Sequence, residues 1–309
     1  MTSIVILMAV YNGARFLQAQ LDSIASQSHQ DWRLLASDDG STDASPDLLQ
    51  AFAAKWPAGQ VTLLRGPHSG AVANFRFLIQ QAAQHGAGVR ASLAFCDQDD
   101  VWQSNHLAQK LDLAPATPRP ILAGGRMVYV DAALQPLGLS PLPQRAPDFG
   151  NALVQNVLSG NTMLMNPAAA ALLIAAEAEA GPFVLHDWWA YQLLSGAGAQ
   201  IAFDPEPTVL YRQHGSNLVG ANSGIAALPQ RLRRHLSGAH ARWHRLNASA
   251  LAASAHRLER QNRLKLQAFQ QAQMSRGLQR LRLLQQAGVW HQSRKATLAF
   301  WISALLGLS

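Results

Sequence analysis

The chain has 309 residues, of which 49% are hydrophobic and 14% are charged. This composition excludes a disordered or collagen-like protein, and the length suffices for one large domain or two smaller ones. The single cysteine, Cys96, excludes a framework of intrachain disulfides and fits a reducing compartment. We read the apolar run at residues 4–10 as a buried first strand, and no apolar run reaches the length of a spanning helix.

The net charge of +7 is distributed unevenly. Residues 221–309 contain fourteen lysines and arginines and one acidic residue, Glu259, whereas residues 1–220 contain eleven basic and seventeen acidic residues. Such an asymmetry indicates two modules with different tasks.

The first 130 residues alternate short apolar runs with helical spacing, and the predicted elements follow in chain order. We expect strands at 4–9, 32–36, 61–64 and 93–96, and helices around 16–24, 46–54, 72–84 and 106–113. Ser45 reads as the N-cap of the second helix, before Pro46 at its first position. Four prolines predict a loop at 136–148. This order predicts an α/β fold with a mainly parallel sheet covered on both faces.

Polar clusters follow three of the predicted strands, and ligands of such sheets bind beyond the carboxyl ends of the strands. The clusters are Tyr11-Asn12-Gly13, the acidic turn at 37–41 and Asp97-Gln98-Asp99-Asp100. Asp97 and Asp99 have i, i+2 spacing, which in extended chain places both carboxylates on one side. Two such oxygen ligands suit Mg²⁺ or Mn²⁺ together with diphosphate oxygens, although a solvated acidic turn is the simpler alternative for an isolated pair.

The remaining candidates are weaker when each is taken alone. Asp39 could accept a hydrogen bond from a pyrimidine N–H, or the acidic segment could be only a turn. Tyr11 could stack on the same base, or it could simply pack at the end of its strand. His186-Asp187-Trp188-Trp189 joins a carboxylate to two aromatic rings, which suits a base in a sugar site; the alternative is core tryptophans with Asp187 capping a helix. His214 could ligate the metal or contact a diphosphate near Arg212, although a lone histidine is more often structural.

Together these segments resemble the family 2 glycosyltransferases, which have the Rossmann-like GT-A fold. The similarity is closest to rhamnosyltransferase-like members that build bacterial surface polysaccharides. It covers residues 3–217 through five segments in order: 8–13, 37–43, 96–102, 186–189 and 211–214. The segment His68 to Phe75 also fits the family pattern, with His68 where asparagine is expected.

The resemblance implies an inverting transfer from a nucleotide-sugar. It implies that Asp39 contacts the pyrimidine base with Tyr11 nearby, and that Asp97 and Asp99 contact the ribose and the metal-bound diphosphate. It further implies that Asp187 is the general base, with His214 closing over the diphosphate. The Gln-x-x-Arg-Trp motif of processive synthases is absent, so we expect a non-processive enzyme.

The predicted domains are a GT-A catalytic domain at 1–220 and a basic, amphipathic helical region at 221–309. The catalytic domain would divide into a nucleotide-binding half at about 1–130 and an acceptor half at about 131–220. In the tail, arginines alternate with leucines and tryptophans from residue 228 onward. This pattern suits an anionic membrane surface, and the alternatives are a helical subdomain with a solvated basic face or, without any supporting motif, nucleic-acid binding.

The leading hypothesis is a transferase at the cytoplasmic face of the cell membrane, peripherally bound. It would move one sugar, from dTDP-rhamnose or a UDP-sugar, to a polysaccharide or lipid-linked acceptor, with Mg²⁺ or Mn²⁺ as cofactor and no nucleic-acid partner. The alternative is a non-catalytic, nucleotide-binding protein with a membrane-associated assembly role, which loss of Asp187 would have favoured.

Overall fold

The chain forms two compact units in a computed structural model that describes residues 2–214 and 239–305. The sheet unit consists of Met1–Leu142, Leu158–Ala178 and Ala199–Gly220. The helical unit consists of Pro143–Val157, Glu179–Gly198 and Ala221–Ser309. Two segments that precede residue 220 therefore belong with the C-terminal helices, unlike the predicted division at 220. The first part of the basic tail, up to residue 238, lies outside the described residues.

The main sheet of the sheet unit has the strand order β10-β6-β9-β4-β1-β2-β3 among the described residues. Neighbouring strands are parallel except that β9 runs antiparallel to β4 and β6. The strands are β1 (Ser3–Val10), β2 (Trp32–Asp38), β3 (Val61–Arg65), β4 (Ala91–Asp97), β6 (Ile121–Gly125), β9 (Leu164–Met165) and β10 (Gln200–Asp204). The mainly parallel sheet predicted from the sequence is confirmed.

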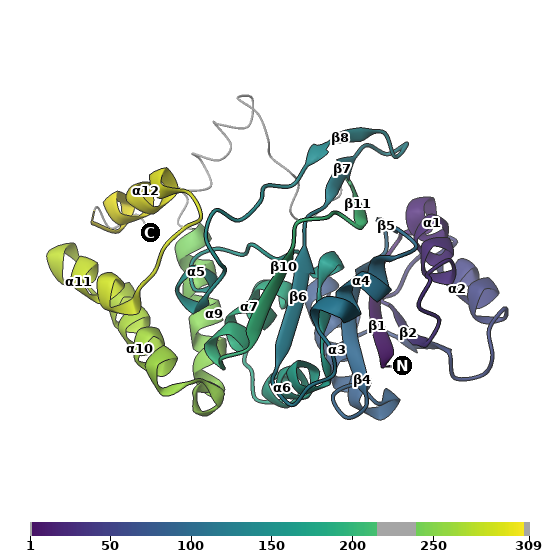
Figure 1. Ribbon diagram of the computed structural model, residues 1–309, viewed down its shortest axis with the longest axis horizontal. Helices are drawn as coiled ribbons and strands as arrows, with labels where there is room; N and C mark the ends of the chain where they lie inside the picture. Colours follow the sequence, from purple (N-terminus) through teal and green to yellow (C-terminus); the bar gives the residue numbers. More distant parts are fainter. Residues whose placement is uncertain (1, 215–238, 306–309) are drawn as a thin grey trace. The chain divides into compact units, whose positions relative to one another are not determined.

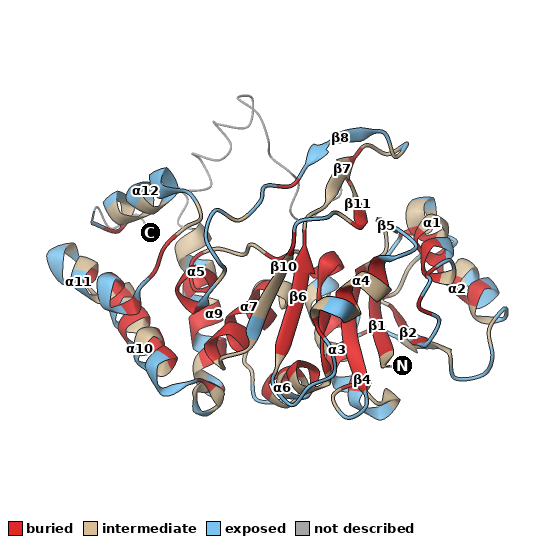
Figure 2. Ribbon diagram, in the orientation of Figure 1, coloured by how far each residue is buried: buried red, intermediate tan, exposed pale blue. Residues whose placement is uncertain are grey.

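Helices cover both faces of this sheet, as its apolar strands require (Figure 1). They are α1 (Ala14–Ala25), α2 (Ser45–Ala53), α3 (Ala71–Ala82), α4 (His106–Leu113) and α6 (Pro167–Glu177), with short 3₁₀ turns η1 (Ala83–His85) and η2 (Gly160–Thr162). Ile4, Ile6 and Met8 of β1 share one apolar core with residues of α1, α2 and α4. The intervening residues point to the opposite face because side chains alternate along a strand, and α3 contacts β1. Figure 2 shows β1, β4 and β6 as buried strands.

Two local predictions need correction. Ser45 is the first residue of α2 and not its N-cap; its hydroxyl instead accepts a hydrogen bond from the Gly13 N–H at 2.9 Å. The predicted loop at 136–148 begins with a short strand, β8 (Pro136–Leu139). Pro136 is tolerated there because β8 is an edge strand, where a missing N–H costs little.

A second, smaller sheet has the order β5-β11-β7-β8. Its other strands are β5 (Val101–Trp102), β7 (Val128–Val130) and β11 (Val209–Arg212). Because β5 directly follows the Asp97–Asp100 turn and β11 ends at Arg212, this sheet brings the acidic turn and the segment that leads to His214 together.

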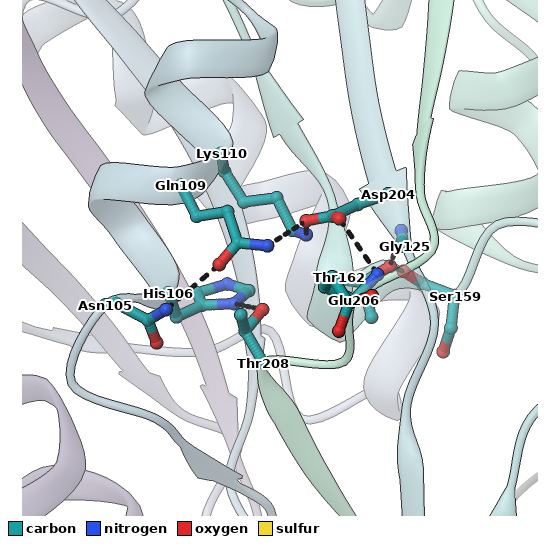
Figure 3. A network of polar contacts seen from close by, with 10 residues as sticks. All are labelled: Asn105, His106, Gln109, Lys110, Gly125, Ser159, Thr162, Asp204, Glu206 and Thr208. Carbon is teal, nitrogen blue, oxygen red and sulfur yellow. Dashed lines mark hydrogen bonds and ion pairs between the residues drawn. The ribbon is translucent and has the colours of Figure 1, made fainter.

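A buried ion pair connects α4 to the end of β10 within the sheet unit (Figure 3). The Lys110 ammonium lies 2.6 Å from the Asp204 carboxylate, which also accepts a hydrogen bond from the Gln109 side chain at 2.9 Å. Burial lowers the pKa of Lys110, and the Asp204 carboxylate opposes that shift. Nearby, Nδ1 of His106 lies 2.7 Å from the Thr208 hydroxyl. This network ties the residues before β11 to α4 and so positions one side of the small sheet.

The helical unit contains α5 (Phe149–Ala152), α7 (His186–Gly196), α9 (Ala239–Ala253), η4 (Ala255–Arg257), α10 (Arg260–Met274), α11 (Gly277–Ala287) and α12 (Arg294–Leu305). Successive helices of its C-terminal part contact one another, and α7 packs against α5 and α9. The described part of the tail therefore packs as helices, and its binding to a membrane surface stays a prediction. Of the described residues, no helix is long and apolar enough to cross a membrane.

Candidate active site

The carboxyl ends of β2, β1 and β4 lie next to one another at one edge of the main sheet. Val10 is paired with Asp38 across β1 and β2, and Ala9 is paired with Asp97 across β1 and β4. The three polar clusters that follow these strands therefore meet at the same edge, as predicted from the order of the elements.

Gln98 joins two of these clusters. Its Oε1 accepts a hydrogen bond from the Tyr11 N–H at 2.9 Å, and its Nε2 donates to the Tyr11 carbonyl at 3.1 Å. The Tyr11 side chain is 56% exposed, so its ring faces solvent at the sheet edge. Gly13 makes room for the amide, because a Cβ at that position would lie 2.3 Å from Gln98 Oε1. The sequence analysis does not predict this role of Gln98, although its position between the candidate carboxylates Asp97 and Asp99 could have indicated it.

The acidic turn after β2 mainly builds the start of α1. The Ser41 hydroxyl accepts from the Asn12 N–H at 2.9 Å, and Asp43 Oδ2 accepts from the Ala14 N–H at 3.0 Å. In return, Asn12 Oδ1 accepts from the Thr42 N–H at 2.8 Å. The bond to Asp43 gives the first N–H group of α1 a partner that the helix itself cannot supply. Ser41, Thr42 and Asp43 therefore have a structural role at the start of α1, and a role of this segment in nucleotide binding stays a prediction.

Asp39 is 6% exposed and shapes the loop that precedes α3. Its two carboxylate oxygens accept hydrogen bonds from the N–H groups of His68 and Gly70, both at 2.7 Å. Gly66 packs close to this carboxylate, since a Cβ there would lie 2.7 Å from Asp39 Oδ1. Each oxygen has a second lone pair, so the carboxylate can still accept a base N–H.

Asp99 and His214 come together although 115 positions separate them in the chain. His214 Nε2 lies 2.7 Å from Asp99 Oδ2, and the side chains are 15% and 21% exposed. The Phe16 ring lies 5.0 Å from the imidazole, centroid to centroid. Asp97 is the last residue of β4 and is partly buried. Within residues 2–214 and 239–305, no three His, Cys, Asp or Glu side chains gather as a preformed metal site.

Asp100 and Arg212 form the buried support beneath this pair. Asp100 is fully buried and accepts hydrogen bonds from the Arg212 N–H at 3.0 Å and from the Asn161 side chain. Burial, and then the charge of Asp99, raise the pKa of Asp100 to about 8. Asp100 belongs to the acidic cluster predicted at 97–100, and its full burial makes it a support of that turn.

Arg212, predicted to bind the donor, is only 3% exposed. Its guanidinium donates to the carbonyls of Asp99 and Ala132, at 2.8 and 2.6 Å, and lies over the Phe16 ring at 4.5 Å. These contacts hold the acidic turn against β11. They identify a positioning role for Arg212, and its contact with the donor stays a prediction.

Asp187, the predicted base, is the second residue of α7 in the helical unit. Its Oδ2 accepts a hydrogen bond from the Asn156 amide at 3.0 Å, and its Oδ1 accepts from the Trp188 N–H at 2.7 Å. The two tryptophans belong to the core and are not exposed sugar-binding faces, which corrects that expectation. Trp188 donates to the Ala152 carbonyl at 2.7 Å, and Trp189 is fully buried and stacks on Phe183 at 4.6 Å.

The main sheet, its one antiparallel strand and the acidic turn after β4 define the GT-A class of glycosyltransferase folds. S. aureus TarS 1-349 in complex with UDP-GlcNAc matches 98% of this chain and 81% of its own, with a TM-score of 0.58 and 13% identity. Another TarS structure is matched over only 43% of its length. The mannosyltransferase PcManGT from Pyrobaculum calidifontis, in complex with GDP-Man and Mn²⁺, gives a TM-score of 0.51 at 14% identity, covering 99% of this chain and 86% of its own.

The family model of glycosyl transferase family 2 matches residues 5–170, and the chain belongs to this family. It is 27% identical to the dTDP-rhamnosyl transferase RfbG of Shigella flexneri over 231 residues, which span 73% of this chain and 78% of that protein. It is 28% identical over 102 residues to the putative teichuronic acid biosynthesis glycosyltransferase TuaG of Bacillus subtilis, covering 33% of this chain and 38% of that protein.

Proposed function

We propose that this family 2 glycosyltransferase moves one sugar at a time from a nucleoside-diphosphate donor to a hydroxyl of a polysaccharide or lipid-linked acceptor, with inversion. The donor is dTDP-rhamnose or a UDP-sugar. The similarity to RfbG, a dTDP-rhamnosyl transferase by name, supports the first donor, and the fold likeness to TarS, solved with UDP-GlcNAc, is compatible with the second.

The observation that supports this proposal most directly is the clustering at the edge of the main sheet. Tyr11 is exposed there, and Gln98 bonds its backbone to the turn that bears Asp97 and Asp99. We assign Tyr11 and Asp39 to the base, and Asp97 to the ribose and diphosphate. An exposed ring offers a stacking surface, and the hydrogen bonds from Gln98 hold the Tyr11 backbone in place before a ligand binds.

Asp187 is the proposed general base. In the transfer, the acceptor oxygen bonds to the anomeric carbon on the face opposite the diphosphate, and the bond from that carbon to the diphosphate oxygen breaks. The acceptor proton passes to the Asp187 carboxylate, and the nucleoside diphosphate leaves. The hydrogen bonds from Asn156 and the Trp188 N–H fix the carboxylate for this task.

The donor set around Asp99 fits Mg²⁺ or Mn²⁺. Asp97 and Asp99 offer hard carboxylate oxygens, which suit either ion, and His214 adds an imidazole nitrogen beside Asp99. The Asp99 and His214 side chains are partly accessible. Because the described residues do not preform a three-ligand site, diphosphate oxygens would complete the coordination. A bound ion supplies positive charge that offsets the charge of the departing diphosphate.

We further propose a peripheral location on the cytoplasmic face of the cell membrane, through the helical unit. Leu278, Leu298 and Ile302 on α11 and α12 are 69%, 63% and 50% exposed. Arg282, Arg294 and Lys295 on the same two helices are exposed as well. Exposed apolar side chains among cations suit the interface of an anionic membrane. Binding to anionic vesicles should weaken as salt is added; tight binding that ignores salt contradicts this location.

The proposed activity is tested with a panel of nucleotide-sugars in the presence of Mn²⁺ or Mg²⁺. Release of the nucleoside diphosphate is measured with and without acceptor extracts. We expect release with one donor class, and faster release when the acceptor is present. If no donor yields the free nucleoside diphosphate under any of these conditions, the alternative of a non-catalytic nucleotide-binding protein gains support.

A further inference from the structure

The first turn of α1 carries a cation that the proposed function has not used. Arg15 is the second residue of this helix, which begins at Ala14 directly after the turn that bears Tyr11. Arg15 is exposed, and no hydrogen bond or ion pair between described residues involves its guanidinium. The helix contacts β5, the strand that follows the acidic turn. This cation therefore belongs to an element that borders the candidate active site.

The Phe16 ring brings Arg15 close to the pair formed by Asp99 and His214. The Arg15 guanidinium lies 4.9 Å from the centroid of this ring, and the Arg212 guanidinium lies 4.5 Å from it. The His214 imidazole lies 5.0 Å from the ring, centroid to centroid, and its Nε2 lies 2.7 Å from the Asp99 carboxylate. One aromatic ring thus separates the exposed cation from the pair that we assign to the metal.

Arg15 differs from the other charged groups around this ring, whose partners lie within the site. The Arg212 guanidinium donates to the Asp99 carbonyl at 2.8 Å, and His214 is paired with the Asp99 carboxylate. Burial lowers the pKa of Arg212, the neighbouring carboxylates oppose that shift, and the charge of Arg15 adds to it. The two guanidinium groups are therefore close enough to repel one another. An anion bound at Arg15 would relieve this repulsion.

The stability of α1 does not account for a cation at this position. The N-terminus of a helix carries partial positive charge, so an arginine in the first turn is unfavourable for the helix itself. Among the described residues of α1, none in the first turn is acidic. An anion at this place would interact favourably with both the guanidinium and the end of the helix.

We propose that Arg15 binds the diphosphate of the nucleotide donor, beside the pair formed by Asp99 and His214. The planar guanidinium can donate two hydrogen bonds to one phosphate group, and it keeps its charge throughout the reaction. When the bond between the anomeric carbon and the diphosphate oxygen breaks, its electron pair stays on that oxygen, and the guanidinium stabilises the resulting negative charge. This inference rests on the proposed function, because it requires a nucleoside-diphosphate donor.

The test measures binding of dTDP and UDP to the full chain by calorimetry, with and without Mg²⁺. The nucleotide that binds more tightly is the probe, and the matching nucleoside, which has no phosphate, is the comparison. We expect Arg15→Gln to weaken binding of the nucleotide at least fivefold and to leave binding of the nucleoside within twofold. Arg15→Lys keeps the charge but cannot donate in the same paired geometry, so it should recover part of the affinity.

The matched control is Arg90→Gln. Arg90 is exposed and directly precedes β4, so it lies at the end of that strand opposite the acidic turn. This variant has the same net charge as Arg15→Gln and should bind the nucleotide as the native chain does. An equal loss of affinity in both variants would reflect net charge alone and would overturn the proposal.

The unfolding midpoint separates binding from a structural role. If Arg15 only stabilised α1 through its contact with the Phe16 ring, Arg15→Gln would lower the midpoint and leave the nucleotide affinity of the folded chain unchanged. We expect the reverse, an unchanged or slightly higher midpoint with a weaker affinity. In the transfer assay, the same variant should raise the KM for the donor and not the KM for the acceptor.

Native-like nucleotide binding by Arg15→Gln overturns the proposal, and a higher KM for the acceptor alone would then assign Arg15 to an anionic acceptor. If the native chain itself binds neither dTDP nor UDP, the proposed function fails and this inference fails with it. The native chain therefore tests the proposed function, and the comparison of Arg15→Gln with Arg90→Gln tests Arg15.

Discussion

The Gln98 side chain bonds the backbone of Tyr11 through both of its amide atoms. Its Oε1 accepts a hydrogen bond from the Tyr11 N–H at 2.9 Å, and its Nε2 donates one to the Tyr11 carbonyl at 3.1 Å. The amide thereby joins the end of β1 to the turn after β4, so it links the proposed base-binding residue directly to the proposed diphosphate-binding turn.

Replacement of Gln98 should therefore weaken donor binding more than it slows the chemical step. Gln98→Ala removes two hydrogen bonds, each contributing about 1 kcal/mol. We expect a several-fold higher KM for the donor with a smaller change in kcat, measured by release of nucleoside diphosphate. The control is Gln103→Ala, whose side chain is exposed. An unchanged KM would mean that Tyr11 needs no such support.

Asp187→Asn separates the proposed base from the donor site. The amide keeps the size of the side chain but cannot take up a proton, so we expect kcat to fall by about 10²–10⁴-fold. Donor affinity, measured by calorimetry, should stay within twofold because the residues assigned to the donor are unchanged. Asp112→Asn serves as the control at an exposed site. Activity equal to that of the native enzyme would remove Asp187 as the base.

The ion pair between Lys110 and Asp204 makes a prediction about stability. Lys110→Met leaves a buried carboxylate without its cation and should lower the free energy of unfolding by about 3–5 kcal/mol. The double variant Lys110→Met with Asp204→Asn should recover part of that loss because no buried charge remains. Urea denaturation measures both, and Lys55→Met at an exposed site should change the value by less than about 0.5 kcal/mol. If the double variant loses the sum of the free energies of unfolding that the two single variants lose, Lys110 and Asp204 do not stabilise one another.

His106 makes the free energy of unfolding depend on pH. Burial, and then the charge of Lys110, hold the pKa of His106 well below its ordinary value of 6.5. As pH falls below about 6.5, the unfolded chain takes up a proton that the native chain does not, so the native state loses stability. When the pH is lowered from about 7 to about 5, the free energy of unfolding should fall less for His106→Gln than for the native chain. The exposed His68→Gln is the control, and equal slopes for native and His106→Gln would refute this assignment.

The sequence alone determined most of the elements that build the sheet unit. Apolar runs with the period of a strand, alternating with helical spacing, located β1 to β4 and α1 to α4 to within a few residues. The same order of elements predicted that the three polar clusters would meet at one edge of the sheet. These predictions succeeded because hydrophobic periodicity and turn chemistry are local, and because parallel strands place their carboxyl ends together.

Only the tertiary structure decided which polar residues are buried and which residues they contact. Arg212 and Arg280 resemble solvated cations in the sequence, yet each is enclosed by segments that are distant along the chain. The sequence around Trp188 and Trp189 does not show whether their rings are exposed or buried. The packing of the helical unit places both rings in its core. The pairing of Asp99 with His214 spans 115 positions. The free energy of burying a charge or an aromatic ring depends on partners that only folding brings together, so no local pattern could specify these contacts.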